Sequence, residues 1–398
     1  MIKKKFIARN ENFGMVVYDV SRLEHFFLPR EEINDFISLH DVQIMDNIPF
    51  EENKEILFAP IRVYYEVTLA CNLKCRTCLN NSGKSKQDEL DLEQSIQVIE
   101  GLKEDSVFDV RFTGGELTQK PSWDVIMQTA KRVGLVVTLT SNGIYSPETI
   151  EKLIIIKPHE TSISLDGFGI HNDYIRGKGS FEKAIESIKK LKEGGCRVTI
   201  NSLITRMLDE NDIKRMLNFA EIYCDDISFF HMRPIGRGTN VKEKMLDYDE
   251  LHQFMEKIEK IKETHPKLKV RTRSSSLIYN SIGREQKKEF GLMEGGPDGF
   301  TRLNILSNGD LYAGGCVPYV EPRLQPKLKL GNIVQEEYSL SNIWRFNERL
   351  KRIREISSDL KKKCDNCSDY KTKCSGFTLE MELYRKINPD HKNPYCKY

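Results

Sequence analysis

The chain has 398 residues, 39% of them hydrophobic and 30% charged, with a formal net charge of +2; this is the composition of a soluble globular protein long enough for two or three domains. The near-balanced charge excludes the strong positive field that attracts nucleic acid, and the lack of any apolar run of roughly 18 residues excludes a membrane-spanning helix. The basic N-terminus also lacks the apolar stretch of a secretion signal, so we expect a cytoplasmic protein.

The first 55 residues hold no cysteine and are predicted to form a small N-terminal unit. Two short strands are predicted at Met15–Tyr18 and His25–Leu28, because β-branched and aromatic residues gather on either side of a turn. A short helix is predicted at Glu31–Leu39, directly after Pro29. The expected unit is a β-hairpin followed by a helix.

A regular alternation of strands and helices begins at Ile61. Six strands are predicted, at Ile61–Thr68, Val107–Thr113, Leu135–Thr140, Glu160–Leu165, Arg197–Leu203 and Asp226–Met232. Helical stretches fall between them, near Leu92–Lys103, Ser122–Val133, Pro147–Ile154, Phe181–Glu193 and Asp212–Ile222. This order predicts an α/β fold with a parallel sheet and right-handed crossovers. We expect the sheet to curve into a partial (β/α)6 barrel of the TIM type, with ligands at the carboxyl ends of its strands.

The alternation ends near Asp247. A bridging helix is predicted at Tyr248–Glu263, and a β-hairpin at Thr301–Leu306 and Leu311–Ala313 around the turn Ser307–Asp310. The last segment is dense in cysteine and poor in regular pattern, which indicates a small fold held by metal. The expected domains are a small N-terminal unit at 1–55, a barrel at 56–246, a bridging helix and linker at 247–299, and a cysteine-rich domain at 300–398.

Most of the ten cysteines fall into two groups, which in a chain without a secretion signal indicates metal binding rather than disulfides. The first group, Cys71, Cys75 and Cys78, directly follows the first predicted barrel strand. Thiolates suit iron–sulfur clusters. Since a [4Fe–4S] cluster normally takes four cysteines, three leave one iron open to a ligand with an amine and a carboxylate. A zinc site with a fourth ligand from elsewhere is the alternative.

The second group supplies four thiolates, from Cys364, Cys367, Cys374 and Cys396. This set completes either a closed [4Fe–4S] cluster or a structural zinc site, and the spacing alone does not decide between them. Cys196 and Cys224 flank predicted barrel strands and are expected to be buried core residues.

Residues Glu66–Cys78 read EVTLACNLKCRTC and closely resemble the cluster loop of the radical S-adenosylmethionine (SAM) superfamily. The resemblance extends to about Gly238 and implies that the three cysteines hold the [4Fe–4S] cluster to which SAM binds. Thr113–Glu116 ends the second strand, where such enzymes bind the methionine amine; glycines permit close backbone approach, and Glu116 can pair with an ammonium. Thr140–Gly143 ends the third strand, where they contact the ribose.

The resemblance also implies that Ser164 and Arg176 hold the SAM carboxylate. The implied SAM-binding residues are together Gly114, Gly115, Glu116, Ser141, Asn142, Ser164, Asp166 and Arg176. Thr77 departs from the pattern, because the family usually has an aromatic residue near the adenine at this position. Contacts to the adenine are therefore expected from elsewhere in the chain.

The C-terminal part resembles the SPASM domain of radical SAM enzymes, through the hairpin Leu303–Gly315 that ends in Cys316, the turn Gly331–Ile333 and the helix start Leu340–Trp344. The full SPASM pattern holds two auxiliary clusters, but Gly295–Pro297 and Thr378 stand where this pattern expects further cysteines. The resemblance therefore implies one auxiliary [4Fe–4S] cluster, on Cys364, Cys367, Cys374 and Cys396. The hairpin cysteine is expected to be free, or an isolated functional thiol.

Residues Phe6–Leu39 faintly resemble small domains that capture the leader of a ribosomal precursor peptide by adding it to a strand edge. A plain cap on the barrel is the alternative, since the unit is shorter than most domains that fold alone. The whole resemblance implies a radical SAM enzyme that abstracts hydrogen from a ribosomally made peptide and forms an oxidative crosslink. Its expected partners are the precursor peptide and an electron donor such as flavodoxin or ferredoxin.

Three other functions remain open at this point. A peptide epimerase would need a thiol hydrogen donor, for which Cys316 is the candidate. A tetrapyrrole or small-molecule oxidoreductase could use the same scaffold, and a zinc-binding scaffold that grips a peptide or protein partner would not be an enzyme. Sulfatase maturation is disfavoured, because such enzymes carry an Asp directly after the hairpin cysteine and this chain has Val317.

Overall fold

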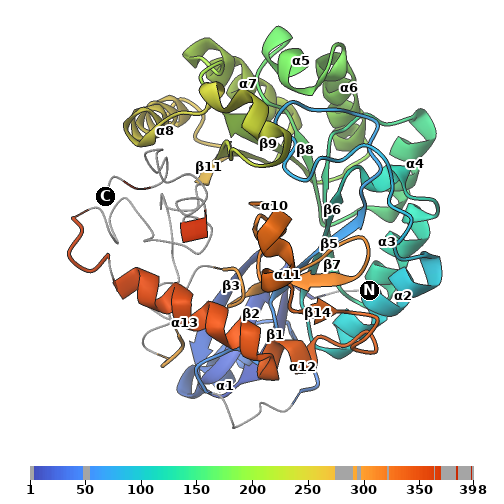
Figure 1. Ribbon diagram of the computed structural model, residues 1–398, viewed down its shortest axis with the longest axis vertical. Helices are drawn as coiled ribbons and strands as arrows, with labels where there is room; N and C mark the ends of the chain where they lie inside the picture. Colours follow the sequence, from blue (N-terminus) through green and yellow to red (C-terminus); the bar gives the residue numbers. More distant parts are fainter. Residues whose placement is uncertain are drawn as a thin grey trace.

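The computed structural model describes residues 4–47, 54–273, 290–293, 297–320, 322–362, 364–368, 382–383 and 396. Two sheets organise them: a four-stranded sheet near the N-terminus, and a ten-stranded sheet that runs through the barrel into the C-terminal part (Figure 1). No helix in this described part of the chain combines the length and the apolar character that crossing a membrane requires.

The N-terminal sheet has the strand order β3-β2-β1-β4. Its elements, with the accompanying helix, are β1 (Phe6–Glu11), β2 (Gly14–Asp19), β3 (Glu24–Pro29), α1 (Ile33–Leu39) and β4 (Val42–Ile44). The predicted strands and helix are confirmed, and β1 and β4 are additional. β2 is buried along its whole length, because Met15 and Val17 pack on the α1 side while Val16 and Tyr18 join the core of the barrel.

Seven parallel strands form the barrel part of the large sheet: β5 (Arg62–Thr68), β6 (Asp109–Gly114), β7 (Val136–Ser141), β8 (Glu160–Ser164), β9 (Val198–Ile204), β10 (Asp226–His231) and β11 (Lys269–Arg273). The helices of this part are α2 (Leu92–Glu104), α3 (Trp123–Arg132), α4 (Pro147–Ile156), α5 (Ile170–Arg176), α6 (Ser180–Glu193), α7 (Glu210–Tyr223) and α8 (Tyr248–Lys262). They follow the outer side of the sheet in an arc (Figure 1). The predicted barrel strands and helices are confirmed.

The C-terminal part does not stand apart from the barrel. Its elements are β12 (Arg302–Ile305), β13 (Asp310–Tyr312), α10 (Val317–Val320), η4 (Pro322–Leu324), α11 (Gln325–Leu328), β14 (Gly331–Asn332), α12 (Ser341–Phe346) and α13 (Glu348–Lys362). The predicted hairpin is confirmed as β12 and β13, and β12 also pairs in parallel with β5. Trp344 of α12 is buried and donates its indole NH to the carbonyl oxygen of Leu57 at 2.7 Å.

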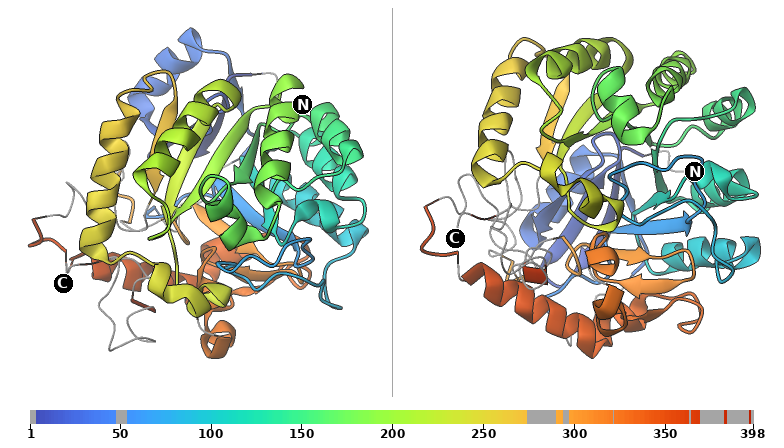
Figure 2. Two further views of the ribbon diagram at one scale, coloured as in Figure 1. Left: turned by 90° about the horizontal axis from the view of Figure 1, so that it is seen from above. Right: turned by 45° about the horizontal axis from the view of Figure 1, so that its top comes forward.

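Polar side chains fill the inner side of the barrel at the amino ends of its strands. Arg111 of β6 contacts the Glu160 carboxylate of β8 at 2.5 Å. Asp109, at the start of β6, pairs with Arg62 and accepts a hydrogen bond from the Tyr18 hydroxyl of β2 at 2.5 Å. The N-terminal sheet therefore covers the amino end of the barrel, and its place beneath the strands is visible in Figure 2. Access for ligands is left to the opposite, carboxyl end.

Candidate active site

The three cysteines of the first group lie in one loop at the carboxyl end of β5, and all three side chains are partly exposed. The loop returns on itself, because Cys71 NH donates to the carbonyl oxygen of Gly83 at 3.1 Å and Gly83 NH donates to that of Leu69 at 2.9 Å. We call residues 70–83 the cysteine loop. Its position matches the strand end where ligands of parallel barrels bind.

Two glycines at the end of β6 allow the cysteine loop to approach closely. Gly115 NH donates to the carbonyl oxygen of Thr68 at 2.7 Å. A Cβ atom on Gly115 would lie 2.1 Å from the carbonyl oxygen of Ala70, and one on Gly114 would lie 2.4 Å from that of Thr68. Gly114 also has a φ of +129°, a region that side chains rarely adopt. Only glycine fits these positions.

Glu116 is fully buried and orders the end of β7. Its Oε2 accepts hydrogen bonds from the Ser141 hydroxyl at 2.8 Å and from Asn142 NH at 2.9 Å. The side-chain amide of Asn142 then donates to Asn72 Oδ1 at 2.7 Å, inside the cysteine loop. Burial raises the pKa of Glu116, although these hydrogen bonds oppose the rise. The carboxylate thus positions Asn142 against the loop, and its pairing with a ligand ammonium stays a prediction.

Arg176, at the end of α5, lies beside the cysteine loop. Its Nε is 2.8 Å from Asp166 Oδ2, while Asp166 Oδ1 accepts from Leu203 NH at 2.8 Å. Burial lowers the pKa of Arg176, but the Asp166 carboxylate and the nearby Cys75 and Cys78 outweigh it and raise this pKa above its usual value. A fixed cation therefore faces the cysteines.

Arg237 fixes the cysteine loop, a contact that the sequence did not indicate. It lies in η3 (Gly236–Lys244). Its guanidinium donates to the carbonyl oxygens of Cys75 at 2.7 Å and Ser82 at 2.8 Å, and its main-chain NH donates to that of Cys78 at 2.9 Å. Gly236 has a φ of +58°, and a Cβ atom there would lie 2.2 Å from the carbonyl oxygen of Leu79. The pair Gly236-Arg237 after the sixth predicted strand is the sequence signal that could have identified this residue.

The residues that the resemblance assigned to SAM end or follow neighbouring strands of the barrel, and of these Gly115 and Asn142 contact the cysteine loop directly. They come from the ends of β6, β7 and β8, from the turn after β8 and from α5: Gly114, Gly115, Glu116, Ser141, Asn142, Ser164, Asp166 and Arg176. Three thiols in one loop with cations beside them suit a thiolate-bound iron–sulfur cluster, because cations offset the charge of the thiolates. Within the described residues, no three Cys, His, Asp or Glu side chains are already grouped closely enough to hold a metal ion.

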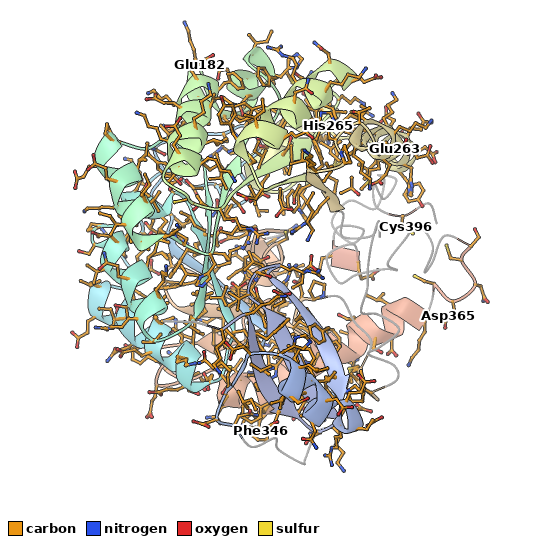
Figure 3. The ribbon with its side chains drawn as sticks, turned by 180° about the vertical axis from the view of Figure 1, so that it is seen from behind. Glu182, Glu263, His265, Phe346, Asp365 and Cys396 are labelled. Carbon is orange, nitrogen blue, oxygen red and sulfur yellow. The ribbon has the colours of Figure 1, made fainter. Side chains whose placement is uncertain are left out.

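The C-terminal cysteines lie away from this loop. Cys364 and Cys367 follow α13 and are partly exposed, with Cys367 NH donating to the carbonyl oxygen of Cys364 at 2.9 Å. Asp365 and Cys396 lie on the same side of the molecule (Figure 3), which is compatible with one shared ligand set. Cys374, predicted as the fourth ligand, lies outside the described residues.

The remaining cysteines occupy two different environments. Cys196 and Cys224 are 2% and 7% exposed, so their prediction as core residues is confirmed. Cys316 is partly exposed and directly precedes α10. It lies near Arg302: burial lowers the pKa of Arg302, but Asp298, Tyr64 and, to a smaller extent, Cys316 outweigh this and raise the pKa above its usual value. The hairpin cysteine is thus brought to the β5 side of the barrel, because Arg302 stands opposite Arg62 in the sheet register.

Comparison with known families assigns two regions of the chain. Residues 65–220 match the radical SAM superfamily. Residues 297–368 match the SPASM iron–sulfur cluster-binding domain. Both matches agree with the resemblances found in the sequence.

The alignments with curated relatives cover about half of this chain. The mycofactocin maturase of Mycolicibacterium smegmatis is 33% identical over 210 residues, which cover 52% of this chain and 52% of the relative. The sporulation killing factor maturation protein of Bacillus subtilis is 30% identical over 205 residues, 50% of this chain and 49% of the relative. This chain therefore matches about half the length of these relatives.

Solved structures show the same fold over most of the chain. The crystal structure of Streptococcus suis SuiB bound to precursor peptide SuiA superimposes with a TM-score of 0.71 at 18% identity, covering 89% of this chain and 90% of SuiB. A structure of anSMEcpe with bound AdoMet gives a TM-score of 0.62 at 16% identity, covering 85% of this chain and 91% of that protein. At these identities the likeness concerns the fold.

Proposed function

Because residues 65–220 form a radical SAM domain and residues 297–368 a SPASM iron–sulfur domain, we propose that this chain is an enzyme that modifies a ribosomally made precursor peptide, most simply by an oxidative crosslink. The observation that carries the proposal is the cysteine loop itself. Three thiols stand in the loop that follows β5, and the predicted SAM-binding residues end or follow the neighbouring strands β6, β7 and β8 or lie in α5.

In this proposal Cys71, Cys75 and Cys78 hold a [4Fe–4S] cluster, which leaves one iron for the amine and carboxylate of SAM. With cluster and SAM bound, the site would supply the radical chemistry that removes a hydrogen atom from the substrate. The chain itself positions the ligands for this chemistry. Arg176 offers a cation to the SAM carboxylate, and Asn142, held by Glu116, orders the rim where the ribose is expected.

The peptide substrate is supported by the names of the relatives. The mycofactocin maturase and the sporulation killing factor maturation protein are maturation enzymes by name, and SuiB was solved with a precursor peptide. The leader-binding role of the N-terminal unit also stays a proposal. β3 and β4 are the two edge strands of that sheet, so a leader strand would add at one of these edges, at the end of the barrel opposite the cysteine loop.

Metal content tests the proposal first. Anaerobically purified protein should contain about eight irons, and a triple Ala variant of Cys71, Cys75 and Cys78 should retain about four, because each [4Fe–4S] cluster contributes four irons. Four irons in the wild type and none in the variant would leave only the first cluster. Zinc without iron after anaerobic reconstitution would contradict the enzyme and favour a zinc-binding scaffold.

Product analysis then separates the peptide reactions. With SAM, a reductant and a candidate precursor peptide, an oxidative crosslink removes a pair of hydrogen atoms from the peptide. An epimerase leaves the mass unchanged in ordinary water and introduces deuterium from D₂O. SAM cleavage without any change in the peptide would point to a tetrapyrrole or small-molecule substrate instead.

A further inference from the structure

A buried carboxylate joins the C-terminal domain to the cysteine loop. Glu66 of β5 is 4% exposed. Its Oε2 accepts a hydrogen bond from Asn80 Nδ2 at 3.0 Å and another from the hydroxyl of Tyr319, and its Oε1 lies 3.4 Å from the main-chain nitrogen of Ser307. One side chain therefore contacts the cysteine loop, the hairpin turn and α10 together.

Each of the two side-chain partners stands close to a cysteine. Asn80 follows Cys78 by two residues, and its Nδ2 also donates to the carbonyl oxygen of Gly114 at 3.0 Å. Tyr319 follows Cys316 by three residues, and its NH donates to the carbonyl oxygen of that cysteine at 3.0 Å. The carboxylate thus connects the segment after Cys78 with the segment after Cys316.

The other cysteines of the loop have separate restraints. Cys71 Sγ accepts from Leu73 NH at 3.4 Å and lies 3.7 Å from Asn142 Nδ2. Cys75 is held through its carbonyl oxygen by Arg237. Loss of the contact at Glu66 should therefore increase the mobility of the end of the loop, residues 78–83, more than that of its beginning around Cys71 and Cys75.

We propose that Tyr319, Glu66 and Asn80 are positioning residues that couple the docking of the C-terminal domain to the conformation of the cysteine loop around Cys78. The coupling rests on the proposed function, because it gives the contact a role in holding the first cluster. It also means that movement of α10, for example on peptide binding, is transmitted to the cluster site. None of the three side chains needs to touch SAM or substrate for this role.

Tyr319→Phe tests the proposal, because it removes the hydroxyl and keeps the ring. Tyr65→Phe is the matched control: Tyr65 is the neighbour of Glu66 on β5, but its hydroxyl donates to Ser95 Oγ of α2 at 3.0 Å, on the other face of the strand. Hydrogen exchange of the full-length protein is measured with and without reconstituted clusters. In Tyr319→Phe we expect residues 78–83 to exchange about fivefold faster, the effect of one lost hydrogen bond.

Four comparisons decide the outcome. Exchange in α7 should not change in either variant, and Tyr65→Phe should leave residues 78–83 as in the wild type. Adding Glu66→Gln to Tyr319→Phe should accelerate exchange no further than the larger single effect, because both act on one contact. In the reconstituted protein, a chelator should remove first-site iron faster from Tyr319→Phe than from Tyr65→Phe.

The proposal is overturned if residues 78–83 exchange equally in Tyr319→Phe and the wild type. It is equally overturned if α7 and the loop accelerate together, since the hydroxyl would then contribute only general stability. Exchange in the metal-free chain does not depend on clusters. A failure of the coupling is therefore distinguishable from a failure of the radical SAM function, which the iron content reports.

Discussion

Gly115 is the residue at which the barrel and the cysteine loop come closest. A methyl group there would meet main-chain atoms, with Ala70 carbonyl oxygen at 2.1 Å and Leu69 carbonyl oxygen at 2.8 Å. A backbone clash cannot be relieved by a change of rotamer, so the loop itself must move. The same contact carries the hydrogen bond from Gly115 NH to Thr68, which would be lost with it.

We expect Gly115→Ala to lose most of the first-site iron while the barrel stays folded, because overpacking at one point costs only about 1–3 kcal/mol. Iron content and far-UV circular dichroism measure the two effects. Gly83→Ala is the matched control in the same loop, since a Cβ atom there meets nothing within 4 Å. If the Gly115→Ala protein kept its full first-site iron, the close approach of Gly115 to Ala70 would not be required for cluster binding.

Among the elements, β6 and β8 are joined across β7 by a buried ion pair. Arg111 contacts Glu160 at 2.5 Å, and its Nε also donates to Thr138 Oγ1 of β7 at 3.2 Å. Burial alone would raise the pKa of Glu160, but the Arg111 guanidinium outweighs it and lowers this pKa from 4.5 to about 2. The ionised carboxylate therefore stabilises the fold above pH 4.5, and this contribution is lost as the pH falls towards 2.

Arg111→Met should destabilise the protein by about 3–5 kcal/mol at pH 7, because it leaves the buried Glu160 carboxylate without its ion-pair partner. Urea unfolding at several pH values measures this. The difference from the wild type should shrink as the pH falls, since the unpaired carboxyl group becomes neutral. The double variant Arg111→Met/Glu160→Gln should recover most of the lost stability at pH 7, and a double variant as unstable as the single one would contradict the explanation.

The alternating barrel elements could be predicted because their apolar periodicity is strong, whereas β11 and α13 could not. β11 reads KVRTR, with a charged residue at every second position, so it lacks the apolar run of a buried parallel strand. α13 carries many charges along ERLKRIREISSDLKK, and only its few buried positions, such as Leu350 and Ile353, mark the packed face. Both elements owe their place to tertiary contacts.

The residues of the candidate site also divide into those that the sequence predicts and those that it does not. The cysteines and the Gly-Gly-Glu turn are readable because their chemistry depends on residue type and spacing. Other contacts arise only when segments that are distant in the sequence meet in the fold. The Arg237 guanidinium donates to two carbonyl oxygens of the cysteine loop, about 160 residues earlier, and Glu66 contacts Tyr319 of the C-terminal domain. No local pattern predicts such pairs.

At the scale of the whole molecule, the N-terminal unit, the barrel and the C-terminal domain meet at residues 54–61. Arg9 is fully buried and donates to the carbonyl oxygens of Ala59 at 2.7 Å and Ser106 at 2.8 Å. From the C-terminal domain, Trp344 donates its indole NH to the carbonyl oxygen of Leu57, and the Arg345 guanidinium lies 4.0 Å from the ring centroid of Phe58. These contacts make the N-terminal unit part of one cooperative structure rather than a tethered module.

Arg9→Met tests this cooperativity. The variant leaves the buried Glu11 carboxylate, paired with Arg9 at 2.8 Å, without its ion-pair partner, which should cost about 3–5 kcal/mol. Both tryptophans of the chain, Trp123 in α3 and Trp344 in α12, lie outside the N-terminal unit. Tryptophan fluorescence during urea unfolding therefore reports the barrel and the C-terminal domain alone.

If the three parts unfold together, Arg9→Met must lower the urea midpoint of the fluorescence transition. If the N-terminal unit is an independent leader-binding module, only circular dichroism will show an early transition and the fluorescence midpoint will not move. Arg22→Met is the control from the same unit, because the Arg22 side chain is 73% exposed and stands 3.9 Å from Asp19; exposed pairs contribute little to stability. A lowered fluorescence midpoint in Arg9→Met, but not in Arg22→Met, would mean that the N-terminal unit stabilises the barrel and the C-terminal domain through the contacts of Arg9.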